Sequence, residues 1–189
     1  WLPDKFGGVF WFGVDDAASS CYMPMFCGIS SVPDELKEGN GSMVDYSPTA
    51  AYWRFTKVSQ LVYSRYSDMI VHVKELQNSL ESGFVSEIKA MGDKFEKLYQ
   101  NNPAQAQAEL TQYSQNAARK VCEAWDQLYI YLLVKYNDGN VKKETNGKFL
   151  KTNTAIPQCE SPEHPEYPEK WYKMIVDDCG NNIKNVGAQ

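Results

Sequence analysis

Two short apolar runs come first in the pattern of hydrophobic and polar positions. Residues 8–14 and 21–26 are almost continuously apolar or aromatic, and a small polar stretch joins them. This pattern predicts two antiparallel strands in a hairpin, with Pro24 at an edge or a bulge of the second strand. Strands that are apolar on both faces are usually covered on both faces. We therefore expect the hairpin to belong to a sheet between other layers, and residues 29–46 to form a loop.

From Ser47 onward the apolar positions follow a helical period. Ser47 and Pro48 are typical of an N-cap and a first helical position. The apolar residues that follow recur at steps of three and four, which places them on one face of a helix of about nine turns. These residues are Ala51, Phe55, Val58, Val62, Tyr66, Met69, Val73, Leu76 and Leu80.

The later part of this region contains further helix signals. Gly83 predicts a break or a kink, after which the same spacing continues. Asn102 and Pro103 are typical of the N-cap and first residue of another long helix, which the turn-forming residues 137–139 end. Residues 47–138 are therefore predicted to form a long antiparallel helical hairpin or a three-helix unit.

The remaining residues, 139–189, show little periodicity and several prolines. They predict a loop-rich tail with one short helix, which Pro168 begins and Gly180 ends. The predicted fold class is α+β and predominantly α-helical, with residues 1–46 as the β-hairpin and its loop. An aromatic hairpin without neighbouring strands suggests that the 189 residues are a single fragment of a larger domain.

Composition and charge exclude two classes of partner. The chain carries a net charge of −5 and has no long block of Lys or Arg, so we expect no nucleic-acid partner. Its longest strongly apolar run, residues 129–134, is too short to cross a bilayer of roughly 30 Å. We therefore expect no membrane span.

The five cysteines indicate neither a zinc site nor a redox motif, because no CxxC or Cys/His cluster is present. Nothing in the sequence indicates a cofactor or a metal. Cys21 and Cys27 are about 20 Å apart on a straight strand, too far for a disulfide. Cys159 and Cys179 are the candidate bridge, which would favour a periplasmic or secreted protein over a cytoplasmic one. Five free thiols are the alternative.

Asp15 and Asp16 form the most suggestive polar pair, because they directly follow an apolar strand. Adjacent residues at a strand end point to opposite sides, so at most one carboxylate faces a cleft while the other caps the turn. We treat both as candidate substrate-binding residues, one of which could order an amine. Turn chemistry alone is the alternative explanation.

Several segments resemble the C-terminal half of the dipeptidase A family of cysteine peptidases. The most specific are Gly-Gly-Val-Phe-Trp-Phe-Gly-Val-Asp-Asp-Ala at 7–17 and Cys-Tyr-Met-Pro-Met-Phe-Cys-Gly at 21–28. Further matches are Gly-Asn-Gly at 39–41, Ser-Pro-Thr-Ala-Ala-Tyr-Trp at 47–53, Tyr-Ser-Arg-Tyr at 63–66 and Val-Lys-Tyr-Asn-Asp-Gly at 134–139. The resemblance covers about residues 1–140.

This resemblance implies the fold and chemistry of an N-terminal-nucleophile hydrolase. Such enzymes stack two sheets between helical layers, and an N-terminal Cys attacks the peptide carbonyl with its own α-amine as the base. The present sequence begins with Trp1, and Cys21 is internal, so no catalytic residue is carried over. The start without Met or a signal-type segment suggests a piece of a longer precursor.

We therefore interpret the sequence as the C-terminal part of a dipeptide-hydrolysing cysteine dipeptidase, inactive on its own. Its expected partners are the remainder of the dipeptidase polypeptide and a small peptide substrate. The alternative is a non-catalytic helical protein-interaction module or a degenerate family member. The sequence immediately upstream of Trp1 discriminates between them, because a signal peptide ending before a Cys favours the enzyme.

Overall fold

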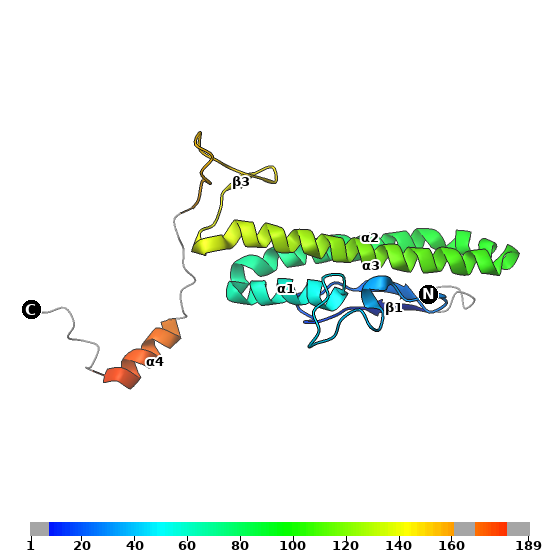
Figure 1. Cartoon of the computed structure of the whole chain (residues 1–189), viewed down its shortest axis with the longest axis horizontal. Helices are drawn as coiled ribbons and strands as arrows, with labels where there is room; N and C mark the ends of the chain where they lie inside the picture. Colours follow the sequence, from blue (N-terminus) through cyan, green and yellow to red (C-terminus); the bar gives the residue numbers. More distant parts are fainter. Residues whose placement is uncertain (1–7, 161–168, 181–189) are drawn as a thin grey trace, which may run out of the picture. The chain divides into compact units, whose positions relative to one another are not determined.

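The structure is a computed structural model that describes residues 8–160 and 169–180 (Figure 1). The chain divides into two compact units, residues 1–134 and 135–189, and each is described by itself. The described residues are mostly helical, with two small antiparallel strand pairs. The predicted α+β, predominantly helical class is therefore confirmed.

The first unit begins with the predicted hairpin. Strand β1 (Val9–Phe12) pairs with β2 (Met23–Phe26) in an antiparallel register that places Trp11 opposite Pro24. Both strands are shorter than the apolar runs that predicted them. Pro24 occupies a position whose N–H points away from β1, which is where a proline costs no ladder hydrogen bond.

The outer edge of β2 is closed by side chains of the helices. The Tyr22 N–H donates to Glu81 Oε1 at 3.0 Å, and the Phe26 N–H donates to Ser114 Oγ at 3.2 Å. Between them, Pro24 has no N–H to donate. This edge therefore presents no free donor to another strand.

The outer edge of β1 is different. The Gly8 carbonyl accepts a hydrogen bond from the Cys27 N–H at 3.0 Å. Because hydrogen-bonded and non-hydrogen-bonded pairs alternate along an antiparallel ladder, the main-chain N–H and C=O groups of Val9 and Trp11 point away from β2. Within the described residues this sheet ends at β1. Phe10 is 59% exposed. The larger sheet expected from the sequence remains a prediction, and β1 is the edge at which it would continue.

Three helices follow the hairpin and its loop: α1 (Ala51–Ser64), α2 (Tyr66–Asn101) and α3 (Pro103–Tyr136). The loop contains a 3₁₀ turn, η2 (Asp34–Leu36). The predicted three-helix unit is thus confirmed, with α2 and α3 running side by side (Figure 1).

The predicted helix start at Ser47 and Pro48 is wrong, because α1 begins at Ala51. The Ser47 hydroxyl donates to Asn40 Oδ1 at 2.6 Å, and the Ala50 N–H closes a turn on the Ser47 carbonyl. The Ser47 side chain is thus engaged with the preceding loop and cannot cap a helix.

A break or a kink is predicted at Gly83, and the break is wrong, because α2 continues through this residue. A glycine inside a helix costs about 1 kcal/mol but does not by itself end the helix. The break lies instead at Arg65, whose φ of −152° and ψ of 62° separate α1 from α2. The Arg65 side chain is largely buried and pairs with Asp68 in the first turn of α2.

The helix start at Asn102 and Pro103 is as predicted. Asn102 Oδ1 accepts a hydrogen bond from the Gln105 N–H at 3.2 Å, which satisfies one of the unpaired donors at the start of α3. A 3₁₀ turn, η3 (Asn137–Gly139), follows α3 at the predicted turn residues. Local side-chain chemistry therefore defines the start of this helix.

The hairpin packs on the two long helices. Phe26 of β2 forms a buried cluster with Ile88 and Phe95 of α2 and Leu110 of α3. Partly buried side chains of β1, Val9 and Trp11 among them, pack against this cluster. Val9, Trp11 and Phe26 thus share the face of the hairpin that packs on this cluster, while Met23 and Met25 on the other face of β2 are buried as well.

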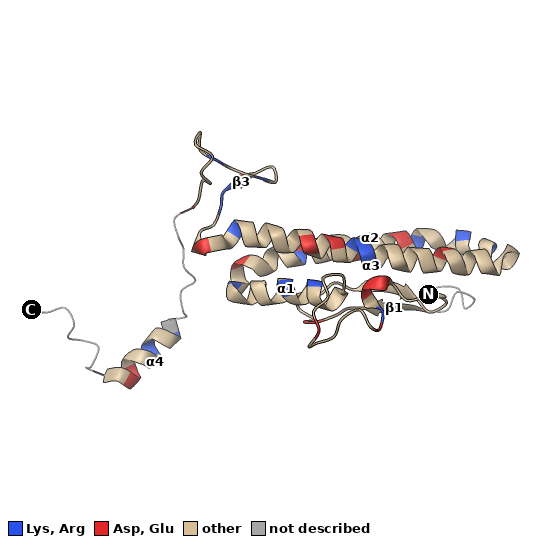
Figure 2. Cartoon of the chain, viewed as in Figure 1, with Lys and Arg blue, Asp and Glu red and all other residues tan. Residues whose placement is uncertain are grey.

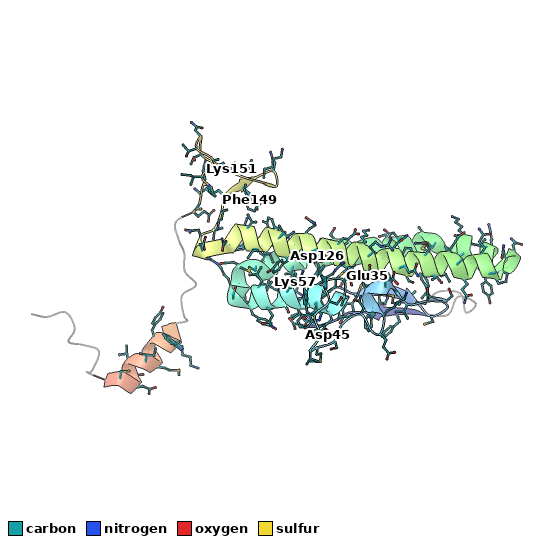
Figure 3. The ribbon with its side chains drawn as sticks, viewed as in Figure 1. Glu35, Asp45, Lys57, Asp126, Phe149 and Lys151 are labelled. Carbon is teal, nitrogen blue, oxygen red and sulfur yellow. The ribbon has the colours of Figure 1, made fainter. Side chains whose placement is uncertain are left out.

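A second core region joins α1 to α3. The rings of Phe55 and Trp125 stack with centroids 4.9 Å apart and planes 18° apart, and both side chains are buried. At the rim of this contact, Asp126 accepts from Lys57 Nζ at 3.2 Å and lies 3.4 Å from Arg54 Nε. Figure 3 shows Lys57 on α1 and Asp126 on α3 near one another.

The second unit contains β3 (Glu144–Thr145), β4 (Lys148–Phe149) and α4 (Glu169–Cys179). Asn146 and Gly147 connect the two strands with φ values of 51° and 72°, as a tight hairpin turn requires. Gly180 follows α4 with a φ of 53°, as predicted for the end of a helix. Pro168, the predicted start, lies outside the described residues.

Among the helices that the structure describes, none combines the length and the apolar character needed to cross a bilayer. Figure 2 shows acidic and basic residues interspersed along α2 and α3. In this view, therefore, neither positive nor negative residues form a continuous patch along these two helices.

Candidate functional site

The Asp15–Asp16 corner connects the end of β1 to α1. Asp15 has a φ of 62°, a left-handed conformation that aspartate tolerates better than most residues. Asp15 Oδ2 accepts a hydrogen bond from the Ser59 hydroxyl at 2.6 Å. Ser59 is buried on α1. Asp15 therefore fixes the loop between the strands to the first helix.

Asp16 closes the turn that follows. Its carboxylate accepts hydrogen bonds from the Ala18 N–H at 3.3 Å and the Ser19 hydroxyl at 3.0 Å, while its carbonyl accepts from the Ser19 N–H. Burial raises the pKa of Asp16, but these bonds and one from the Tyr63 hydroxyl outweigh it and hold the pKa below 3.8. The pKa of Tyr63 is raised in turn, first by the negative charge of Asp16 and then by the hydrogen bond.

The sequence predicts that at most one carboxylate faces a cleft while the other caps the turn. Asp16 is the capping residue, and Asp15 points to Ser59. The expected role of either carboxylate in binding substrate stays a prediction. Chemically, the corner offers two carboxylates and the exposed Tyr63 hydroxyl within one polar cluster.

Asp16→Asn tests the charge at this corner. Because the pKa of Asp16 is lowered in the folded state, its contribution to stability is fully present above the unfolded value, near 3.8. That contribution is lost as the pH falls through the lower folded value. We expect the stability difference between wild type and Asp16→Asn to be constant above about pH 5 and to shrink below pH 4. Thermal unfolding from pH 2 to 7 measures it, with Asp45→Asn as the control for net charge.

A pocket of about 230 Å³ lies beside the hairpin, between β1 and α2. Trp11, Tyr22, Glu81 and Val85 line it. Sequence reasoning missed this pocket and its carboxylate, because Glu81 follows the apolar position Leu80 and resembles any solvated helix charge. Glu81 meets the hairpin through a hydrogen bond from the Tyr22 N–H, which is 59 residues away in the chain.

All five cysteines are unbridged in the structure, and the bridge between Cys159 and Cys179 stays a prediction. Cys21 and Cys122 are buried, and burial raises the pKa of each thiol to about 12. The charge of Glu81 is the next cause at Cys21. Thiols with such pKa values stay protonated at neutral pH.

No set of three His, Cys, Asp or Glu side chains within residues 8–160 and 169–180 is placed to hold a metal ion. The Asp15 carboxylate, for example, is engaged with the Ser59 hydroxyl of α1.

Comparison with known protein families finds a match over the segment that contains the hairpin and its carboxylates. The sequence model of peptidase family C69 matches residues 1–79. The resemblance to the dipeptidase A family is confirmed for this segment. The matched residues include the hairpin, both aspartates of the corner, α1 and the first part of α2. No curated protein and no solved structure matches the chain.

Proposed function

We propose that the chain is the C-terminal part of a cysteine dipeptidase that hydrolyses dipeptides through an N-terminal Cys located outside these 189 residues. The single observation that carries the proposal is the match of residues 1–79 to peptidase family C69. The proposed partners are the remainder of the dipeptidase polypeptide and a small peptide substrate.

The two edges of the hairpin support this proposal. Side chains of α2 and α3 close the outer edge of β2, whereas the outer main-chain groups of Val9 and Trp11 on β1 have no strand beside them within the described residues. Isolated two-stranded sheets are marginal in water, and an open strand edge is a template for pairing. The remainder of the polypeptide would supply the next strand at β1.

The buried cysteines support the placement of the nucleophile elsewhere. A peptidase nucleophile reacts as the thiolate and must reach the substrate. Cys21 and Cys122 meet neither condition, because both are buried and their pKa values are raised to about 12. In this proposal Asp15 and Asp16 contribute to the rim of the substrate site and not to bond cleavage.

One observation favours a second function, that of a non-catalytic helical interaction module. Ile130, Leu133 and Val134 follow one another on α3 at helical spacing, and each is exposed. An exposed apolar stripe on a helix is a common docking surface for a protein partner. A degenerate dipeptidase retained for binding would combine both features.

The isolated chain should show no thiol-dependent turnover of dipeptides, because it lacks the proposed nucleophile. Release of free amino acids from a panel of dipeptides measures this, with and without an alkylating reagent. Cys27→Ser serves as the matched control for Cys21→Ser, since the Cys27 side chain is exposed and the Cys21 side chain is buried. Turnover that alkylation abolishes would overturn the proposal, and its loss in Cys21→Ser or in Cys27→Ser would show which thiol is responsible.

A further inference from the structure

The pocket beside the hairpin combines one acidic group with aromatic and apolar walls. Trp11 comes from β1, Tyr22 from the residue before β2, and Glu81 and Val85 from one face of α2. Its volume of about 230 Å³ is that of a small organic group and not of a macromolecular surface. Tyr22 is 42% exposed, so the pocket opens to solvent on the side of this ring.

The carboxylate in this pocket is only partly used by the fold. Glu81 Oε1 accepts the Tyr22 N–H at 3.0 Å, and no described Lys or Arg forms an ion pair with Glu81. A carboxylate can accept about four hydrogen bonds, so Glu81 Oε2 can still accept hydrogen bonds from a ligand. Glu81 therefore presents an uncompensated negative charge at the pocket wall.

Position 13 lets the ring of Tyr22 lie close to the backbone. A Cβ atom at Gly13 would lie 3.3 Å from two ring carbons of Tyr22 and 3.0 Å from Ser20 Oγ. The glycine thus permits a close approach that a larger residue would disturb. The Tyr22 wall of the pocket therefore depends on the main chain directly after β1.

The chemistry of these walls selects among ligand classes. An anion would be repelled by Glu81, and a purely apolar ligand would leave the carboxylate without a partner. A hard metal cation prefers six or more oxygen ligands, which a single carboxylate among aromatic and aliphatic side chains does not supply. An organic ammonium fits, because it can pair with the carboxylate while an aromatic ring attracts its charge and apolar walls contact its carbon chain.

We propose that this pocket binds a primary ammonium group attached to a small apolar group. The source of the ammonium is either the N-terminus of a short peptide or a free alkylamine. The inference is argued from the geometry of the pocket and not from the family match, since Glu81 and Val85 lie outside the matched residues 1–79 and Trp11 and Tyr22 lie inside them. For a peptide N-terminus as the ligand, the inference rests on the proposed function and deepens it; for a free alkylamine, it stands apart from that function.

The test compares Glu81→Gln with wild type, using the 189-residue chain. Gln keeps an oxygen that can accept the Tyr22 N–H and removes only the charge, so the edge of β2 stays closed. Glu75→Gln is the matched control, because Glu75 is an exposed residue of the same helix outside the pocket and the change in net charge is identical. Circular dichroism verifies that each variant retains its helices.

Calorimetric titration measures binding of four probes: 3-methylbutylamine, its neutral analogue 3-methylbutanol, Leu-Gly and N-acetyl-Leu-Gly. We expect at least one amine-bearing probe to bind wild type and Glu75→Gln alike, and Glu81→Gln to bind it about tenfold more weakly. The alcohol and the acetylated peptide carry no ammonium, so they should bind wild type no more tightly than they bind Glu81→Gln. Binding of Leu-Gly alone identifies a peptide N-terminus as the ligand, and binding of the alkylamine alone identifies a free amine.

Three results would overturn the inference. They are the absence of binding by both amine-bearing probes, equal binding of an amine-bearing probe by Glu81→Gln and wild type, and equal binding of an amine-bearing probe and its neutral analogue by wild type. Should Glu81→Gln lose its helices, Trp11→Leu provides the second variant, because it removes the aromatic ring and keeps the carboxylate. It should weaken binding about threefold, and unchanged binding by Trp11→Leu would then count against the site.

Discussion

Replacing Trp125 by alanine should lower the free energy of unfolding by about 3–5 kcal/mol, the largest effect that we expect from one substitution. Trp125 is fully buried on α3, and its ring stacks on Phe55 of α1 at 4.9 Å. Its removal leaves a large cavity and deletes the main aromatic contact between these two helices. Urea unfolding followed by circular dichroism measures the change.

Trp125→Phe is the matched variant. The indole Nε1 is buried and has no hydrogen-bond partner among the described residues. Phenylalanine keeps a ring against Phe55 and removes this unsatisfied donor, so part of the lost packing is offset. We expect a cost of about 1.5 kcal/mol or less. A loss below about 1 kcal/mol for Trp125→Ala would contradict the packing between α1 and α3.

Gly41→Ala should cost about 2–4 kcal/mol, because two effects add at this position. The φ of Gly41 is 77°, and a Cβ there would lie 2.8 Å from Ser47 Cβ and 2.9 Å from the Asp45 carbonyl oxygen. The main chain around it is fixed, since Trp53 Nε1 donates to the carbonyls of both Ser42 and Asp45 at 3.0 Å. The new methyl group therefore cannot be accommodated by rotating a side chain.

Gly39→Ala separates the two effects. Gly39 has a φ of 86°, yet nothing lies within 4 Å of a Cβ built there. We expect this variant to cost only the backbone strain of a left-handed alanine, about 1–2 kcal/mol. Thermal and urea unfolding of both variants provide the comparison. Equal decreases in the free energy of unfolding for Gly41→Ala and Gly39→Ala would show that the loop rearranges to make room for the methyl group at position 41, which would contradict the prediction.

Much of the fold could be predicted from hydrophobic periodicity, since the apolar residues of each element face one core. The apolar runs predicted β1 and β2, and the steps of three and four predicted the helices. The start of α3 was also predictable, because its signal is local: Asn102 Oδ1 accepts the N–H of Gln105, three residues later. Signals of this kind need no tertiary contact to be recognised.

The errors arise where a contact between distant residues decides the outcome. Ser47 fails to cap a helix because its hydroxyl binds Asn40 in the preceding loop. Gly83 does not interrupt α2, since glycine disfavours a helix by only about 1 kcal/mol and the next residue, Phe84, is buried in the core. The break at Arg65 has no proline or glycine signal in the sequence.

In the candidate site, too, the residues with a local sequence signal could be predicted, whereas contacts between distant residues could not. Asp15 and Asp16 could be selected from the sequence because they directly follow an apolar strand. The partner of Asp15, Ser59, lies 44 residues away and belongs to a helix, so their pairing depends on the folded structure. The pocket carboxylate of Glu81 was missed for this reason as well, since it meets Tyr22 only across the packed hairpin.

The most direct test of the central claim is the mass of the native polypeptide that contains these residues, measured on protein purified from its source. We predict a chain heavier than the 21.5 kDa of this sequence, with an N-terminal Cys and thiol-sensitive hydrolysis of dipeptides. A native protein of 21.5 kDa that hydrolyses dipeptides without any further chain would contradict the account.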